Sequence, residues 1–261
     1  MSIVARERPG VYSDYEASGV IFANKTGKTV GIVALSGGVV GQVYIITKVS
    51  DAKTIFGENG LMVNLCQTAL ENGAYKIAAV SAGNSADNYK AAFDALKVKD
   101  DICAIICDSQ SVAVQALLKE SVVFASENLK ERIGIVSASK TETLSTWAEN
   151  FNNERIVLIA QQAIGANGEE LSGCLLAAAL AGVISKNDDP STSFNGVNLE
   201  GVYGLNTSLS EDNIDEYINL GITPFEVVSN KVEIIRAVTS KITLNGVDDK
   251  TFKELNTILI I

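Results

Sequence analysis

Short apolar runs alternate with amphipathic segments along the middle of the chain. Each apolar run has the length of one strand, and each intervening segment has helical spacing. Strands joined by helices of this length form βαβ units, so we expect an α/β fold with a parallel-rich central sheet and flanking helices. The pattern predicts strands at 74–80, 102–107, 132–136 and 155–160, and helices at 86–96, 112–129, 142–151 and 169–184.

The segment before this alternation is rich in β-branched residues. Two β-rich runs, 29–35 and 42–47, flank the glycine turn at 36–38, and we expect these strands to pair or to be neighbours. A helix is predicted from 61 to 72, because Gly73 follows it as glycine commonly does. We expect this β-containing part to pack beside the parallel sheet.

The segment after the alternation mixes turns, one helix and short β-rich runs. Residues 208–211 fit a capping box that opens a helix through Leu220. Two β-rich segments follow, at 223–229 and 231–242. The last five residues are apolar, which predicts either a terminal strand or a natural chain longer than this one.

These features divide the chain of 261 residues into four expected parts. They are an extended N-terminal arm (1–28), an N-terminal β-containing part (29–84), an α/β core (85–198) and a C-terminal α+β part (199–261), which we expect to be truncated.

Composition excludes several classes of chemistry. The chain has no histidine, which removes Ser-His-Asp and Cys-His catalysis, histidine general bases and histidine metal ligands. The formal net charge of −10 disfavours nucleic acid and anionic membranes as partners. The most apolar helical segment, 171–184, has 14 residues, which is too short for a membrane span. We therefore expect no enzyme, no cofactor and no membrane span.

The four cysteines, Cys66, Cys103, Cys107 and Cys174, are predicted to be reduced core thiols. Cys103 and Cys107 lie four residues apart in one predicted strand. Because side chains alternate along a strand, we expect both on one face, too far apart to form a disulfide.

Two glycine-containing segments invite a phosphate-binding interpretation. Residues 134–141 have the spacing of a P-loop, but Ser139 replaces its second glycine, and an ordinary strand-to-helix turn is favoured. Residues 36–41 lack the spacing of a dinucleotide loop, and a β-rich run follows where a helix should begin.

Neighbouring carboxylates offer the other candidate chemistry. The candidate pairs are Asp100-Asp101, Glu169-Glu170, Asp188-Asp189 and Asp248-Asp249. Asp188-Asp189 lies in the most irregular segment, which makes it the best cation candidate; Mg²⁺ or Ca²⁺ would suit such oxygen ligands. We expect these pairs to be solvated, and we assign no metal.

Several motifs follow one another in an order typical of one family. Residues 7–12 (ERPGVY) are close to the RPGVY motif that opens contractile tail sheath proteins. Residues 48–57 (KVSDAKTIFG) resemble that family's segment ending in Phe-Gly. A helix and a two-glycine turn follow in the family, and here Ala74 replaces the second glycine. Five further motifs resemble the family: LAGVISKND (180–188), NLEGV (198–202), LGIT (220–223), RAVTS (236–240) and FKELN (252–256).

On these motifs the chain resembles the contractile phage tail sheath protein family, which includes sheaths of phage-tail-like bacteriocins and related injection machines. The resemblance implies a structural subunit that is made in the bacterial cytoplasm and stacks as six-membered rings around an inner tube in a virion or tail-like particle. Contraction of the sheath would drive the tube through a target envelope. The implied partners are neighbouring sheath subunits, the inner tube protein, and baseplate and tail-terminator proteins.

The resemblance also implies which residues serve assembly. In the family, terminal arms add strands to the sheets of neighbouring subunits. The corresponding arm here carries Arg8, Pro9, Gly10, Val11, Tyr12 and Tyr15. The C-terminal family motifs carry Arg236, Phe252, Leu255 and Asn256. Two other functions stay open on the sequence: another assembly module of a phage or bacterial surface, and a small-molecule enzyme on an α/β scaffold.

Overall fold

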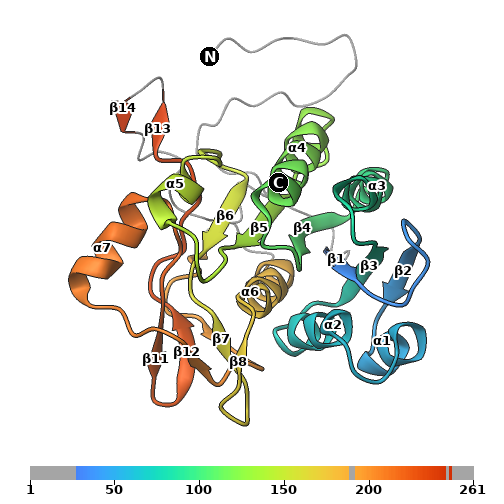
Figure 1. The fold of residues 1–261 in the computed structure, drawn as a ribbon, viewed down its shortest axis with the longest axis horizontal. Helices are drawn as coiled ribbons and strands as arrows, with labels where there is room; N and C mark the ends of the chain where they lie inside the picture. Colours follow the sequence, from blue (N-terminus) through green and yellow to red (C-terminus); the bar gives the residue numbers. More distant parts are fainter. Residues whose placement is uncertain (1–27, 188–191, 245–246, 249–261) are drawn as a thin grey trace.

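A six-stranded sheet forms the centre of the molecule (Figure 1). The computed structural model describes residues 28–187, 192–244 and 247–248. The strands run in the order β2-β3-β1-β4-β5-β6, and all neighbours are parallel except β2 and β3. The predicted α/β class and parallel-rich sheet are therefore confirmed. The strands are β1 (Thr29–Leu35), β2 (Val43–Ile46), β3 (Lys76–Ala82), β4 (Ile102–Cys107), β5 (Ile133–Ser137) and β6 (Ile156–Ile159).

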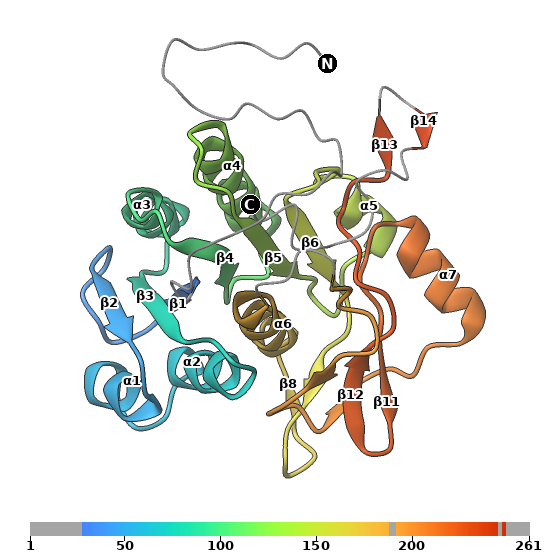
Figure 2. The same cartoon turned by 180° about the vertical axis from the view of Figure 1, so that it is seen from behind.

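Helices cover both faces of this sheet (Figure 2). Each face has its own apolar core, because the strands are buried on both sides. The first core packs under α1 (Val49–Phe56), α2 (Leu61–Glu71) and α6 (Cys174–Lys186), and the second under α3 (Ala86–Lys97), α4 (Val112–Glu127) and α5 (Leu144–Ala148).

The first two strands do not pair or lie next to each other, contrary to the prediction. Strand β3 lies between them, parallel to β1 and antiparallel to β2. The reason is burial: six of the seven residues of β1 are buried, which suits a central strand, whereas β2 is half exposed and forms the sheet edge. The expectation that residues 29–35 pack beside the sheet is wrong for the same reason. The division of the chain into four parts remains a prediction.

A β-bulge in β4 overturns the expected arrangement of Cys103 and Cys107. Thr29 of β1 faces Ile102, but Val30 faces Ala104, so Cys103 is an extra residue in the ladder. The bulge shifts the alternation of side chains by one residue. Cys103 therefore packs in the first core and Cys107 in the second, on opposite faces of the sheet.

The bounds of three helices differ from the prediction. Helix α6 begins at Cys174 rather than 169, because Glu170–Leu171 forms strand β8 and pairs with β7 (Ala163–Ile164) around a glycine turn. Helix α7 (Glu211–Asn219) is capped by Ser210 and not by Ser208. The Ser210 hydroxyl oxygen accepts a hydrogen bond from the Asn213 amide, and Asn213 completes the capping box. Helix α5 is also shorter than predicted.

Short strands complete the C-terminal part. Strand β10 (Gly204–Leu205) joins β7 and β8, while β9 (Asn198–Leu199), β11 (Phe225–Val228) and β12 (Lys231–Ile234) form a third sheet. Strands β11 and β12 form a hairpin, and Ser229 and Asn230 at its turn both have positive φ, as a tight hairpin turn requires. A two-stranded pair, β13 (Thr243–Leu244) and β14 (Val247–Asp248), ends the described chain.

Helix α6 is buried on almost all sides, as its alanine-rich sequence predicts. At Gly182 a Cβ atom would lie 2.5 Å from the carbonyl oxygen of Ala69 in α2, so only glycine allows the two helices to approach this closely. Within the described ranges, no helix is long and apolar enough to cross a membrane.

Candidate functional site

The sheet has one place where α/β proteins commonly bind ligands. The chain moves to one side of β1 to form β3 and then returns to form β4 on the other side, so the strand order reverses between β1 and β4. A crevice at the carboxyl ends of the strands at such a point is the usual ligand site of an open α/β sheet. This region is therefore the first candidate for chemistry.

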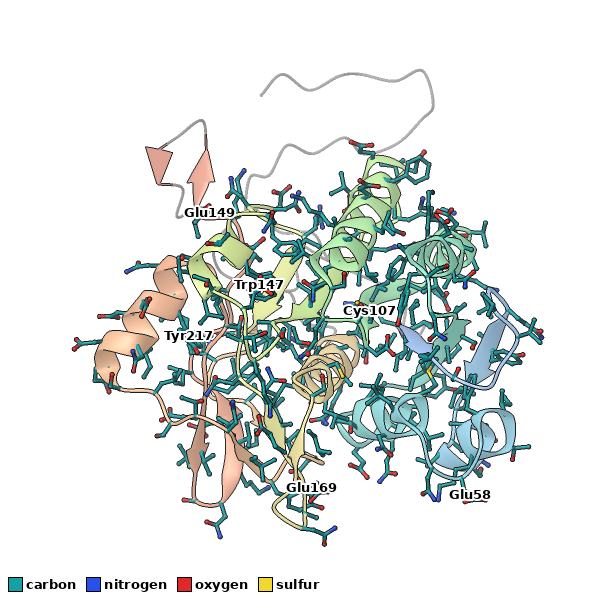
Figure 3. All side chains as sticks on the ribbon, in the orientation of Figure 1. Glu58, Cys107, Trp147, Glu149, Glu169 and Tyr217 are labelled. Atoms are coloured by element: carbon teal, nitrogen blue, oxygen red, sulfur yellow. The ribbon has the colours of Figure 1, made fainter. Side chains whose placement is uncertain are left out.

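Glutamine side chains fill the neighbouring carboxyl ends of β5 and β6. The Gln162 side chain is buried; its Nε2 donates to the Ala138 carbonyl (3.1 Å), and its Oε1 accepts from the Gly173 amide (2.8 Å). Gln115 is fully buried, donates to the Ser137 carbonyl (2.8 Å) and accepts from Trp147 Nε1 (2.9 Å). Trp147 belongs to α5 and is labelled in Figure 3. Protein groups thus satisfy the polar atoms that a ligand would otherwise contact.

Asp108, at the reversal point itself, is held by the protein in the same way. One of its carboxylate oxygens accepts from the Tyr89 hydroxyl (2.6 Å) and the other from the Leu35 amide (2.9 Å). Burial, followed by this hydrogen bond to the Asp108 carboxylate, raises the pKa of Tyr89. The phenol therefore stays protonated as a donor. Through its two oxygens Asp108 links the end of β4 to helix α3 and to the end of β1.

The P-loop-like segment does not form a phosphate cradle. Gly134 lies inside β5, where a side chain would meet Leu118 of α4 at 2.4 Å. The next helix begins only at Leu144, and Lys140 pairs with Glu170 at 2.7 Å. In the other glycine segment, 36–41, strand β2 follows instead of a helix.

Replacing Lys140 with alanine is expected to change little. The ion pair with Glu170 is exposed, and such pairs contribute about 0–1 kcal/mol. Thermal unfolding followed by circular dichroism should therefore show a shift of no more than about 2–4 °C. Loss of a nucleotide-dependent activity in a folded Lys140→Ala variant would contradict the absence of a phosphate site here.

The paired carboxylates are engaged in ordinary surface contacts. Asp100 pairs with Lys130, Asp101 pairs with Lys76 and accepts from the Thr29 hydroxyl, and Glu169 accepts from the Asn167 amide. The Asp188-Asp189 cation candidate lies outside the described residues. In the part of the chain that the structure describes, no three His, Cys, Asp or Glu side chains are grouped as metal ligands.

All four cysteines are free and buried, which confirms the predicted core thiols. Burial raises the pKa of the Cys66 and Cys103 thiols to about 12 and that of Cys174 to about 11, and it also raises the pKa of Cys107. A thiol needs its deprotonated form to react. These side chains are therefore packing residues at neutral pH.

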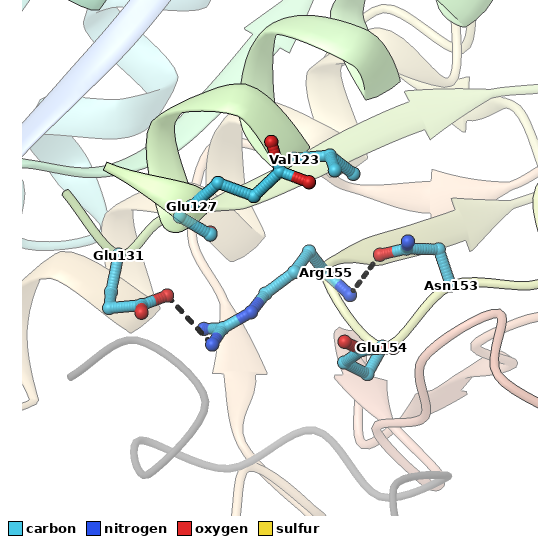
Figure 4. Close-up of a pocket in the computed structure, with 7 residues that line it drawn as sticks. Val123, Glu127, Glu131, Asn153, Glu154 and Arg155 are labelled. Carbon is cyan, nitrogen blue, oxygen red and sulfur yellow. Dashed lines mark hydrogen bonds and ion pairs between the residues drawn. The ribbon is translucent and has the colours of Figure 1, made fainter. Parts of the chain in front are cut away.

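A shallow pocket of about 270 Å³ lies between the end of α4 and the start of β6 (Figure 4). Arg155 is almost fully buried in its wall and pairs with Glu131 at 2.7 Å. Two further carboxylates, Glu127 and Glu154, also line the pocket. With three carboxylates against one guanidinium, the pocket repels phosphate and other anions.

Three of the family-like motifs meet at one point between α2 and α6. Asn72 Nδ2 donates to the Glu200 carbonyl (2.8 Å), and the Glu200 amide donates back to Asn72 Oδ1 (2.9 Å). Gly182 packs against the same turn, with a hypothetical Cβ 2.8 Å from the Asn72 Cβ. The segments around residues 72, 182 and 200 thus form one packing unit.

Two other motifs form a second unit at the outer edge of β6. The Thr223 hydroxyl donates to the Val238 carbonyl (3.0 Å) and accepts from the Val238 amide (3.2 Å). The Thr223 and Ser240 amides donate to carbonyls of β6, at Leu158 (2.9 Å) and Ile156 (2.7 Å). The motifs therefore act through packing and backbone hydrogen bonds, which sequence reasoning did not assign to them.

Of the residues predicted to serve assembly, only Arg236 lies within the described part of the chain. Arg236 is exposed, directly before the Val238–Ser240 segment that packs on β6. The arm residues Arg8, Pro9, Gly10, Val11, Tyr12 and Tyr15 lie outside the described residues, as do Phe252, Leu255 and Asn256. Their assembly role stays a prediction.

Known structures share this fold. The sheath tail protein of Desulfitobacterium hafniense is similar with a TM-score of 0.74 at 11% identity, over 96% of this chain and 79% of that one. A sheath tail protein of Listeria innocua gives 0.71 at 11% identity, over 89% and 73%. The helical sheath of the anti-feeding prophage in its contracted state gives 0.69 at 14% identity, over 94% and 70%. No curated protein sequence matches the chain.

The sequence itself identifies the family. The model of the phage tail sheath protein central domain matches residues 82–240, which is more than half of the chain. The match covers strands β4, β5 and β6, helix α6 and the second packing unit, together with Gly182 and Glu200 of the first. The chain therefore belongs to the phage tail sheath protein family.

Proposed function

We propose that the protein is the structural subunit of a contractile sheath, which polymerises as stacked six-membered rings around an inner tube and contracts to drive that tube through a target envelope. The match of the sheath central domain to residues 82–240 carries this proposal. Similarity of the fold to a contracted helical sheath supports it.

The filled crevice supports a structural role over an enzymatic one. Beside the reversal point, at the carboxyl ends of β5 and β6, Gln115 bonds to Trp147 and Gln162 bonds to backbone groups, so these polar side chains are satisfied within the protein. Two alternative functions were open on the sequence: a small-molecule enzyme and a different surface module of a phage or bacterium. No feature of the described residues favours either of them over the sheath role. Catalysis is not needed for contraction, because a collective switch between two packings can release energy stored during assembly.

Neighbouring copies of this chain are the first proposed partners, followed by the inner tube, baseplate and tail-terminator proteins. An N-terminal arm with Pro9, Gly10, Val11 and Tyr12 can lend its backbone hydrogen bonds to the sheet edge of another subunit. Such a link keeps subunits connected while they rotate as rigid bodies. The site of synthesis would be the bacterial cytoplasm, and assembly would place the protein in a virion or tail-like particle.

Deletion of residues 1–18 tests the arm. We expect the shortened chain to fold, because every described strand and helix lies after residue 28, but to remain a monomer. Sedimentation velocity measures the polymer fraction, and circular dichroism checks the fold against the full chain. Polymers of the usual size from the shortened chain would contradict the arm's role.

A further inference from the structure

Three large apolar side chains are exposed together where α3 and α4 end. Val98 and Leu129 are each 71% exposed and Phe124 is 51% exposed. Both helices end at the amino ends of the parallel strands that follow them, so these residues lie at the same end of the sheet. We call Val98, Phe124 and Leu129 the α3–α4 patch.

Leu129 adopts a backbone conformation that disfavours leucine. Its φ is 61° at the end of α4, a position where glycine is the usual residue. A bulky side chain in this left-handed region is strained, and Leu129 points its side chain mostly into solvent. Nothing in the fold of the subunit explains leucine here, whereas contact with another molecule would.

Lysines surround the patch and hold it in place. The Lys97 ammonium lies 5.0 Å from the centroid of the Phe124 ring, and the Lys130 ammonium donates to the Lys97 carbonyl (3.3 Å). Lys97 pairs with Asp94 and Lys130 with Asp100. Among the described residues, Lys99 has no carboxylate partner. The patch is therefore an apolar surface bordered by two neutralised lysines and by Lys99, which is left without a carboxylate partner in the described part of the chain.

Helix α7 carries the opposite charge to Lys99, because its surface is acidic. Its surface carries Glu211, Asp212, Asp215 and Glu216, none of which forms an ion pair within the described residues, and the sequence from 206 to 230 contains no lysine or arginine. Glu211 with Asp215, and Asp212 with Glu216, are like-charge pairs at i,i+4, which destabilise a helix unless cations lie nearby.

The apolar side of α7 is only partly used within the subunit. Tyr217 and Leu220 pack against the second core, and no residue of the helix is buried. Ile214 and Ile218 are half-exposed and pack on neither core among the described residues. The helix thus presents isoleucines beside unpaired carboxylates.

We propose that the α3–α4 patch of one subunit docks against α7 of a second copy of this chain. Helices α3 and α7 lie at opposite sides of the molecule in both views (Figures 1 and 2), so the contact joins two different surfaces. Such a head-to-tail contact generates a ring when the rotation closes and a helical filament when it does not. The proposal rests on the sheath role and assigns one of its subunit interfaces.

Charge exchange across the contact tests this pairing. Lys99→Glu and Asp215→Lys are each expected to lower the polymer fraction of the full chain at least tenfold, measured by sedimentation velocity at low salt. The double substitution in one chain should restore assembly, because each interface then again joins opposite charges. Lys53→Glu, on the distant helix α1, is the control for the change in net charge and should assemble normally.

Leu129→Gly separates docking from folding. Glycine relieves the strained φ, so the thermal midpoint should stay the same or rise while assembly falls.

Electron microscopy of each variant shows whether sleeves form. Normal sleeves from both single charge variants and from Leu129→Gly would overturn the docking and leave the sheath role intact. Single variants that lose assembly without recovery in the double variant would overturn the pairing with α7. A full chain that never self-associates would overturn both proposals.

Discussion

Replacing Gly182 with valine is expected to lower the free energy of unfolding by about 3 kcal/mol. Any Cβ at this position lies 2.5 Å from the Ala69 carbonyl oxygen and 2.8 Å from the Asn72 Cβ. Backbone atoms of α2 cannot move aside as a flexible side chain can, so α2 and α6 must separate. The separation would also disturb the Asn72 hydrogen bonds to Glu200 that hold the 198–202 segment.

Tryptophan fluorescence during urea unfolding measures this effect, since Trp147 is the only tryptophan and is fully buried. A matched control is Gly37→Val, where no heavy atom lies within 4 Å of an added Cβ. The Gly182 variant should show a midpoint shift several times larger than the control. Equal midpoints for the two variants would contradict the close packing of α2 on α6.

Replacing Trp147 with alanine is expected to cost about 4 kcal/mol. The indole is fully buried, packs against Phe151 with ring centroids 5.6 Å apart, and donates its N–H to Gln115. Alanine leaves a cavity beside the second core and removes the donor from a buried acceptor. Trp147→Phe keeps an aromatic ring and removes only the donor, which should cost about 1–3 kcal/mol.

Circular dichroism in urea measures both Trp147 variants, because neither retains a tryptophan. We expect the free energy of unfolding to fall from the wild type to Trp147→Phe and again to Trp147→Ala. The first step measures the contribution of the hydrogen bond and the second that of packing. If alanine and phenylalanine destabilise equally, the loss arises from the hydrogen bond alone, and the indole does not support the glutamine network by filling space.

Long periodic segments were predictable because a local pattern determined them. The strand–helix alternation from residue 74 onward predicted β3, α3, β4, α4, β5 and β6 within a few residues. Burial on both faces leaves continuous apolar runs in these strands, which the sequence displays directly. The same reasoning identified α6 as a buried helix from its alanines.

Features that depend on distant partners were not predictable in this way. The bulge that separates Cys103 from Cys107 arises from the register of β4 against β1, which lies more than sixty residues earlier. The place of β1 at the sheet centre depends on a crossover, and β8 forms only because β7 is available to pair with residues 170–171. Local sequence gives no signal for these pairings.

For the candidate site too, some features were predictable from the sequence and others were not. The motifs around residues 72, 182, 200, 223 and 238 were recognised as typical of the family, but their mutual hydrogen bonds and close approaches emerge only in three dimensions. The buried Gln115 and Gln162 could not be told from surface glutamines, because their partners are backbone groups far along the chain. Exposed apolar residues at helix ends, such as Leu129, carry no distinguishing pattern in sequence.

Negative-stain electron microscopy of the purified full chain is the decisive test of the sheath role. We expect hollow sleeves built of stacked rings, formed without added nucleotide because the subunit contacts alone drive assembly. Dispersed monomers at every concentration, with no larger particle in the presence of an inner tube, would contradict a sheath subunit.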